Sequence, residues 1–465
     1  MKRWLTLGSF VLIAAAIVTF RPVQTPGPFL RDFEAYWSAG SASNARADPY
    51  GRSIWSAERG VPGVDASHDE LLPFVGPPAT LPAWRLLARL PYVVAARWWF
   101  AALSIAVLSL AAIVVGASAG SVSFSTFFAA LALAISFGPV TSDVALGQMA
   151  LIAFLAATVV ALPLSLIPRS AAAFVAFFQP NVAFGLISQL GRNRATLAIA
   201  FGLLATYAAG ALGTGWHWPI EYALRLLRHE DAERLSAIQL TPGAIAYGAG
   251  MPAGTTVLIS IAALIAALAA AVLVWRRVAD PFARFAAIAA LAPFASSFFH
   301  EHDLVVAYIA GVWCALRTRA AVRLLALGAT LLVAIDWLGL AQRPTGMPQS
   351  ILLAIATVAA FTALGTDADW RTAALAGGIL AATFAVAASL AAMHPAPIWP
   401  DALGHFHAVS SASAADVWRD EQRRTGLFAV NPTWAFLRAL SLTGCALVSL
   451  SVFLQSNRDA HFAHD

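Results

Sequence analysis

The sequence predicts an all-α polytopic membrane protein, a transmembrane helix bundle that forms a single integral membrane domain over residues 1–465. Of its residues, 60% are hydrophobic and only 11% are charged, whereas soluble domains carry roughly 25% charged residues. The mean hydropathy is +0.73, and apolar runs of about 18–23 residues, long enough to span a bilayer as helices, recur along the chain. A transmembrane barrel would instead show short segments of alternating polarity. Helices are therefore the expected spanning elements.

The apolar runs divide the chain into candidate membrane segments. They lie near residues 4–20, 92–115, 122–140, 147–165, 194–213, 252–275, 281–298, 303–317, 320–338, 350–365, 371–393 and 436–455. Together with a break near Pro180, they predict about 12–14 membrane segments. The first run follows Lys2 and Arg3, and no small-residue cleavage site follows it. An uncleaved first helix with a cytoplasmic N-terminus is therefore favoured over a signal peptide.

The segment at residues 168–193 decides how the later loops are oriented. If it crosses the membrane once, the arginines within 192–194, 276–277 and 317–323 fall outside. If it enters, breaks at Pro180 and returns, those arginines fall inside, as the positive-inside rule favours. Proline removes a backbone donor and breaks a helix, which is tolerated at membrane depth where the backbone lines a polar cavity. We therefore expect the broken arrangement.

This topology places most polar segments in one compartment. The loops expected on the outer face are 21–91, 140–147, 214–250, 299–303, 339–349 and 394–435. The first carries interfacial helices and an acid, and residues 214–250 contain a charged amphipathic stretch that reads as an outer-face helix. Functional side chains on these loops would then be able to form one site.

An acid stands among aromatic residues at the start of the first outer loop. Asp32 and Tyr36 are four residues apart, so a helix would place them on the same side. Phe33, Trp37 and Gly40 would form the apolar side of that helix. The segment therefore predicts a short interfacial helix that presents an acid beside an aromatic ring. The alternative is a lipid anchor whose acid is only solvated, because aromatic belts are common at membrane interfaces.

Two further polar positions interrupt apolar runs. Gly147-Gln148 precedes a run, where free N–H groups at a helix N-terminus suit phosphate or sugar oxygens. Asp143 would alternatively cap that helix. Gln179 and Asn181 flank the break at Pro180, and buried amides need hydrogen-bond partners. They would either face a ligand or join neighbouring helices.

Four ionisable residues, His300-Glu301-His302-Asp303, form a short loop between two apolar runs. Such groups are costly at the mouth of a membrane helix unless they are used. The pair of histidines beside acids could bind Zn²⁺, but the long-range ligand spacing of a metal motif is missing. Histidine facing a phosphate fits better, and a solvated loop is the remaining alternative.

Composition argues against two other classes of function. The net charge is +5, but the arginines lie in short loops between apolar runs and do not form one patch, so nucleic-acid binding is not expected. The only cysteines, Cys314 and Cys445, lie inside apolar runs. They support neither a disulfide framework nor a thiolate metal site.

Taken in order, these residues resemble glycosyltransferase family 87, the polyprenol-phosphate-mannose-dependent mannosyltransferases of the GT-C type. The resemblance runs through most of residues 1–310 and is most specific in the acid-aromatic block from Asp32 to Gly40. It continues through Asp48-Pro49-Tyr50, Pro77-Pro78, Gly147-Gln148, Gln179-Pro180 and His300-x-x-Asp303. Two positions depart from the family pattern: Phe178 precedes Gln179 where a lysine is frequent, and Met149 follows Gln148 where the block usually continues to an asparagine.

The resemblance implies a GT-C type bundle with interfacial helices on the outer face. It implies a hexosyltransferase that moves a sugar, expected to be mannose, from a polyprenyl-phosphate-linked donor to a hydroxyl of a lipid or glycan acceptor. Inversion at the anomeric carbon is implied as well. The enzyme would lie in the inner (cytoplasmic) membrane of a bacterium, with its active site facing the periplasm or cell exterior. Its partners would be membrane lipids, the donor and the acceptor.

The resemblance also assigns roles to residues. Asp32 would be the general base that takes the proton of the acceptor hydroxyl. The donor-binding residues would be His300, which would stabilise the departing phosphate, with Gln148, Gln179, Tyr36, His302 and Asp303. No residue is assigned to the acceptor, and neither a divalent metal nor another cofactor is expected.

A multi-pass transporter or lipid flippase is the main alternative. It would share the topology, and its polar intramembrane residues would mark a transport pathway. Transporters usually have repeated halves with paired broken helices, and the sequence has one break near Pro180 without a partner in the second half. A membrane scaffold, or an enzyme of this architecture with another lipid-linked sugar, would be further alternatives.

Overall fold

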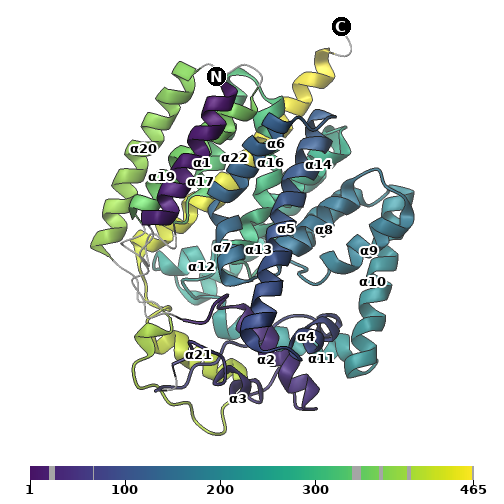
Figure 1. The fold of residues 1–465 in the computed structure, drawn as a ribbon, viewed down its shortest axis with the longest axis vertical. Helices are drawn as coiled ribbons and strands as arrows, with labels where there is room; N and C mark the ends of the chain where they lie inside the picture. The colour runs from purple at the N-terminus through teal and green to yellow at the C-terminus, as the bar shows by residue number, and fades with distance from the viewer. Residues whose placement is uncertain (20–26, 66, 338–346, 366–369, 395–398, 463–465) are drawn as a thin grey trace.

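Helices make up 74% of the chain, and the described residues contain no strand. The computed structural model describes residues 1–19, 27–65, 67–337, 347–365, 370–394 and 399–462 (Figure 1). Most of the expected loop 339–349 and the first residues of 21–91 lie outside these ranges. Both cysteines are buried and free, as the sequence predicts.

Six described helices are long and apolar enough to cross a bilayer. They are α5 (Tyr92–Ala119), α10 (Asn193–Thr214), α13 (Ala253–Arg277), α19 (Met347–Leu364), α20 (Trp370–Met393) and α22 (Pro432–Phe462). Large apolar side chains such as Leu204 on α10 and Leu258 on α13 are exposed, which suits a helix surrounded by lipid. The chain is therefore a polytopic helical membrane protein.

The other apolar runs form helices that are not among these six, most of them shorter, so the described spans are fewer than the predicted segments. These helices are α1 (Lys2–Thr19), α8 (Ala150–Ala161), α9 (Leu166–Ala176), α14 (Pro281–Ala289), α15 (Ala292–Ala295), α16 (Tyr308–Arg317) and α17 (Ala320–Ala334). At 1.5 Å per residue, a helix such as α8 covers roughly 18 Å of a hydrocarbon core about 30 Å thick. Hydropathy alone therefore does not tell which of the apolar runs form single unbroken spans.

One bend lies inside the apolar run expected at 122–140, just before the loop that the sequence predicts at 140–147. The expected loop 140–147 is largely helical: α6 (Phe124–Ser136) and α7 (Gly138–Leu146) form a pair bent by 68° and together could make a seventh span. The bend occurs at Phe137, whose backbone is extended, and Pro139 lies in the first turn of α7, where a missing N–H is tolerated. Gly138 fits because a Cβ there would lie 2.6 Å from the carbonyl oxygen of Ala334.

The predicted break near Pro180 is present. Helix α9 ends at Ala176, and a short turn leads into the 3₁₀ helix η2 (Val182–Gln189). A second 3₁₀ helix, η3 (His302–Ala307), precedes α16. These interruptions leave polar side chains inside the bundle.

The long polar segments pack together at one end of the molecule (Figure 1). This end layer contains α2 (Phe33–Asn44), α3 (Ile54–Glu58), η1 (Pro78–Thr80), α4 (Leu81–Leu87), α11 (Trp218–Glu233), α12 (Pro242–Gly248), η5 (Asp401–Leu403) and α21 (Ala414–Arg424). The Tyr222 hydroxyl donates to the Val75 carbonyl at 2.7 Å, and the Ala408 N–H donates to Asp69 at 3.0 Å. The described parts of segments 21–91, 214–250 and 394–435 thus lie toward one end, opposite Met1 and the C-terminal end of α22. That this end faces outward stays a prediction.

Candidate functional site

A cavity of about 560 Å³ lies where the bundle meets the end layer. Its walls combine the apolar side chains of α1 and α19 with polar side chains from several loops. The predicted site residues on its walls are Asp32, Tyr36, Gln148, Gln179, His300 and His302. Asp303 is fully buried behind the wall and does not line the cavity, because its carboxylate is turned toward backbone and amide donors.

Gln148 joins the acid and the aromatic ring that the sequence places on one side of α2. Its Nε2 donates to Asp32 Oδ2, and its Oε1 accepts a hydrogen bond from the Tyr36 hydroxyl. The Asp32 N–H donates to the Leu146 carbonyl at 2.8 Å. Two segments far apart in sequence are therefore fixed against each other, and Asp32 stands at the N-terminal end of α2 with its carboxylate held toward the cavity.

Asp143 caps α8, as the alternative interpretation of this segment proposes. Its Oδ2 accepts a hydrogen bond from the Leu151 N–H at 2.8 Å, and its side chain is fully buried. The first turn of α8 therefore already has an acceptor. The Gln148 side chain, rather than the helix N-terminus, is the group that this segment presents to the cavity.

The environment of Asp32 differs from that of an ordinary surface aspartate. Burial raises the pKa of the Asp32 carboxyl above its ordinary value of 3.8, while the hydrogen bond from Gln148 and the charges of His300 and Arg31 lower it in part. This desolvation depends on the tertiary packing around Asp32, so it cannot be read from the neighbouring residues in the sequence. A carboxylate with a raised pKa is a stronger base for a hydroxyl proton.

Glu233, which sequence reasoning does not single out, is the most highly coordinated acid beside the cavity. Its Oε1 accepts from Gln239 Nε2 at 2.6 Å and lies 2.6 Å from His300 Nε2. Its Oε2 accepts from Trp418 Nε1 at 2.7 Å and lies 3.0 Å from His229 Nε2. The signal that could have identified it is the His229-to-Glu233 spacing of four residues, which places both on one side of the amphipathic α11.

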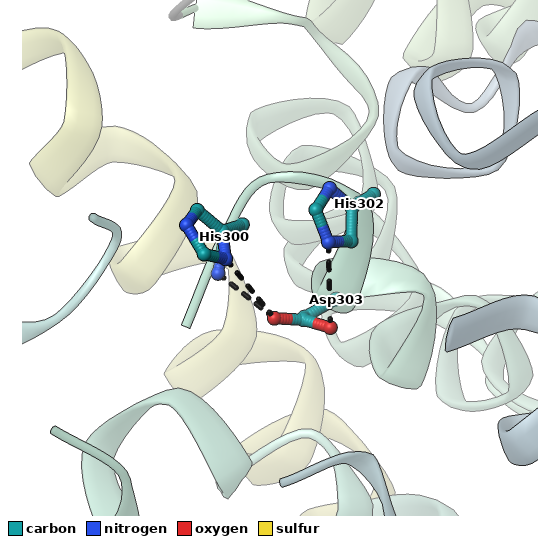
Figure 2. A group of neighbouring side chains, drawn as sticks. All are labelled: His300, His302 and Asp303. Carbon is teal, nitrogen blue, oxygen red and sulfur yellow. Dashed lines mark hydrogen bonds and ion pairs between the residues drawn. The ribbon is translucent and has the colours of Figure 1, made fainter. Parts of the chain in front are cut away.

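His300 stands between two acids. Its Nε2 faces Glu233, while its Nδ1 is 3.9 Å from Asp303 Oδ2 (Figure 2). Burial alone would lower the pKa of His300, but the charge and hydrogen bond of Glu233 outweigh it and raise this pKa above 6.5. The neighbouring acids therefore favour the positively charged imidazole, the form that a phosphate-binding group requires.

Asp303 organises the loop around the broken segment. Its Oδ1 accepts from Gln179 Nε2 at 3.2 Å, and its Oδ2 accepts from Asn181 Nδ2 and from the His300 backbone N–H, both at 2.9 Å. The amides beside Pro180 thus join neighbouring segments, which is the second of the two alternatives that the sequence offers for them. Gln179 also lines the cavity. Asp303 fixes the position of His300 and has no surface for contact with a ligand in the cavity.

His300, His302 and Asp303 also form a group whose ligand atoms lie within 4.8 Å of one another (Figure 2). Both oxygens of Asp303 accept hydrogen bonds from N–H donors, and the two imidazole rings stack at 5.2 Å with an angle of 18°. Nearly parallel rings direct their lone pairs side by side rather than toward one point. This geometry fits a hydrogen-bonded scaffold better than the tetrahedral ligand set of zinc.

A second set of buried acids ties the start of α2 to the C-terminal part of the end layer. Arg31 pairs with Glu70 at 2.9 Å, and its guanidinium lies 4.7 Å from the ring centroid of Trp399. Glu421 accepts from the Leu71 N–H and from Trp399 Nε1, both at 2.8 Å. Burial raises the pKa of neighbouring Glu34 to about 8. These contacts hold residues 31–34 in place behind the cavity.

Gly147 allows the close approach between the Asp32 segment and α8. Its φ is +80°, and a Cβ would lie 2.8 Å from Leu30 Cβ and 3.0 Å from Phe33 Cβ. We expect Gly147→Ala to lower the free energy of unfolding by about 1–3 kcal/mol through overpacking against Leu30 and Phe33, beyond the backbone strain of its positive φ, and to separate Asp32 from Gln148. Gly120→Ala is the matched control, because Gly120 has φ +74° with no atom within 4 Å of its Cβ position. Equal thermal destabilisation of both variants would contradict the steric explanation.

Comparisons with protein-family models, with curated proteins and with solved structures gave no match to this chain. The fold and the cavity define its class as a polytopic helical membrane protein with ionisable side chains gathered between its bundle and its end layer. Its function is inferred from the residues and their geometry.

Proposed function

We propose that this chain is a glycosyltransferase of the GT-C type that transfers a hexose, expected to be mannose, from a polyprenyl-phosphate donor to a hydroxyl of a lipid or glycan acceptor. The observation that best supports this proposal is that one cavity is lined by the acid Asp32, the amides Gln148 and Gln179, and the imidazole of His300. A base and a cationic group beside one space are what a displacement with a phosphate leaving group needs.

In the proposed reaction, the acceptor hydroxyl oxygen attacks the anomeric carbon while Asp32 takes its proton. The new carbon–oxygen bond forms as the bond from the anomeric carbon to the phosphate oxygen breaks, and the bonding electrons leave with the polyprenyl phosphate. A single in-line displacement of this kind inverts the configuration of the sugar. Gln148 and Tyr36 orient the Asp32 carboxylate through their hydrogen bonds.

His300 is proposed to stabilise the charge that develops on the departing phosphate. It lines the same cavity as Asp32, and its charge already lowers the pKa of the Asp32 carboxyl, which indicates that the two groups are electrostatically close. Preorganised charge of this kind is typically worth several kcal/mol in the transition state. The charge of His300 would replace that of the lysine that glycosyltransferase family 87, which the sequence resembles, often carries before the Gln-Pro break.

The apolar wall of the cavity suits a lipid-linked donor. Ile13 and Ala16 of α1 and Leu353 and Ala354 of α19 line it on the bundle side. An isoprenoid chain lying along this wall would place its phosphate toward the polar end of the cavity. We propose that the polar end faces the periplasm or cell exterior of a bacterium whose inner membrane holds the bundle.

The test is an assay of the purified full-length protein in lipid vesicles with a panel of polyprenyl-phospho-sugars, with and without EDTA. We expect release of polyprenyl phosphate with one donor only, the mannose donor, and equal rates with EDTA, since the proposed reaction uses no metal. Movement of the intact lipid between leaflets without release from any donor would overturn the proposal in favour of the flippase alternative.

A further inference from the structure

We propose that Glu233 is a positioning residue that keeps His300 protonated and fixes the orientation of its ring, an inference that rests on the proposed phosphate-binding role of His300. Glu233 belongs to none of the motifs described for the sequence. It lies at the C-terminal end of α11 among exposed charged residues. Its side chain is only 2% exposed. Burying a charged acid costs free energy, which its partners offset. An acid held in this way is expected to have a use for its charge.

The partners of Glu233 keep it ionised. Gln239 and Trp418 each present an N–H group to the carboxylate, and neither group can accept a proton from it. Burial alone would raise the pKa of Glu233, but His300 and His229 outweigh it and hold this pKa well below its ordinary range. The carboxylate is therefore a fixed negative charge at any pH at which the enzyme would work.

A fixed carboxylate at His300 Nε2 determines the protonation of the ring. The distance of 2.6 Å between Nε2 and Glu233 Oε1 indicates a shared proton, and because Gln239 and Trp418 keep the carboxylate ionised, that proton lies on Nε2. The proton that titrates is then the one on Nδ1, the nitrogen that Glu233 does not contact. This is the logic by which a buried acid orients a histidine in a hydrolytic triad, applied here to a histidine that carries charge instead of moving a proton.

The other ionisable groups around His300 do not replace Glu233. Asp303 lies beside Nδ1 on the same loop, but N–H donors occupy both of its oxygens. His302 stacks on the ring and is kept neutral, because burial and the charge of His300 lower its pKa well below 6.5. His229 shares Glu233, and Asp32 acts on His300 only through its charge. Glu233 is the acid that makes a direct hydrogen bond to this ring.

The first experiment measures kcat for Glu233→Gln across pH, with Asp231→Asn as the control. Asp231 is an exposed acid on the same helix that pairs with Arg234 and Arg419. Loss of the Glu233 charge should move the alkaline limb of the profile to lower pH. At pH 8 we expect kcat to fall roughly 10–100-fold, as for other groups that orient a functional histidine, and to recover as the pH is lowered and His300 becomes protonated again. An equal loss at every pH would overturn the proposal.

The second experiment follows the His300 ring directly by NMR of histidine-labelled full-length protein, with His300→Gln assigning the signal. It needs no substrate, so it distinguishes a failure of this inference from a failure of the proposed function. In Glu233→Gln the His300 titration should move to lower pH. In Trp418→Phe, where Glu233 loses an N–H donor and becomes more basic, it should move to higher pH. An unchanged titration in both variants, or movement in the same direction, would overturn the proposal.

Discussion

Replacing Asp32 with asparagine is expected to abolish sugar transfer while leaving the fold and the binding of the donor intact. Asparagine fills the same space at the start of α2 but cannot take the proton of the acceptor hydroxyl. Loss of a general base typically costs about 10²–10⁴ in rate, and Asp32 is the cavity-lining acid whose carboxylate accepts the Gln148 hydrogen bond. The measurement is single-turnover release of polyprenyl phosphate from the donor that the panel identifies.

Asp48→Asn is the matched control for this prediction. Asp48 belongs to the same segment, but it is half-exposed and pairs with Arg225 on the surface of the end layer. Its variant should transfer sugar at the wild-type rate. Near-normal turnover by Asp32→Asn would remove Asp32 from the mechanism.

The wild-type protein should also lose activity on acidification. Because burial raises the pKa of the Asp32 carboxyl, we expect the decline to begin already above pH 3.8.

Replacing His300 with glutamine is expected to lower kcat by about 10²–10³, the usual cost of removing one preorganised group that stabilises developing negative charge. Glutamine keeps an N–H donor but carries no charge, so the departing phosphate loses its cationic partner. The decrease in kcat should be larger with the polyprenyl-phosphate donor than with a donor whose phosphate is a better leaving group. The measurement is kcat at saturating donor for both substrates.

His217→Gln is the control for His300→Gln, since His217 is an exposed histidine just before α11. It should leave kcat unchanged. If His300→Gln raises only the KM for the donor and keeps kcat, His300 binds the donor equally in the ground and transition states. That outcome would contradict its role toward the leaving group.

Local sequence patterns predicted those features that depend on neighbouring residues. A helix period placed Asp32 and Tyr36 together, and the structure brings both to Gln148. Proline chemistry predicted the break at Pro180. The same reasoning did not predict the bend at Phe137, because hydropathy reports how apolar a stretch is and not whether its helix continues through the bundle.

The burial of Glu233 and its contact with Trp418 could not be predicted from the residues beside them in the sequence. Glu233 follows Glu230 and Asp231 in a charged helix, and only tertiary packing decides which of these acids is buried. Trp418 lies in α21, nearly two hundred residues later. No local spacing relates them, so their contact follows from the way the end layer folds over the cavity. Asp303 was misplaced for a similar reason, since its partners at 179 and 181 are distant in sequence.

The contact between Trp418 and Glu233 has a consequence for biosynthesis. A chain emerging from the ribosome can insert α1 to α17 and already contain Asp32, Gln148, Glu233 and His300. The carboxylate of Glu233 receives its Trp418 partner only when α21 has been translated. Until then the charged group beside the cavity is incompletely satisfied, and the nascent protein holds a bundle without a finished site. A product that ends before α21 would therefore lack both the Trp418 contact and α22, which packs against α17 in the bundle.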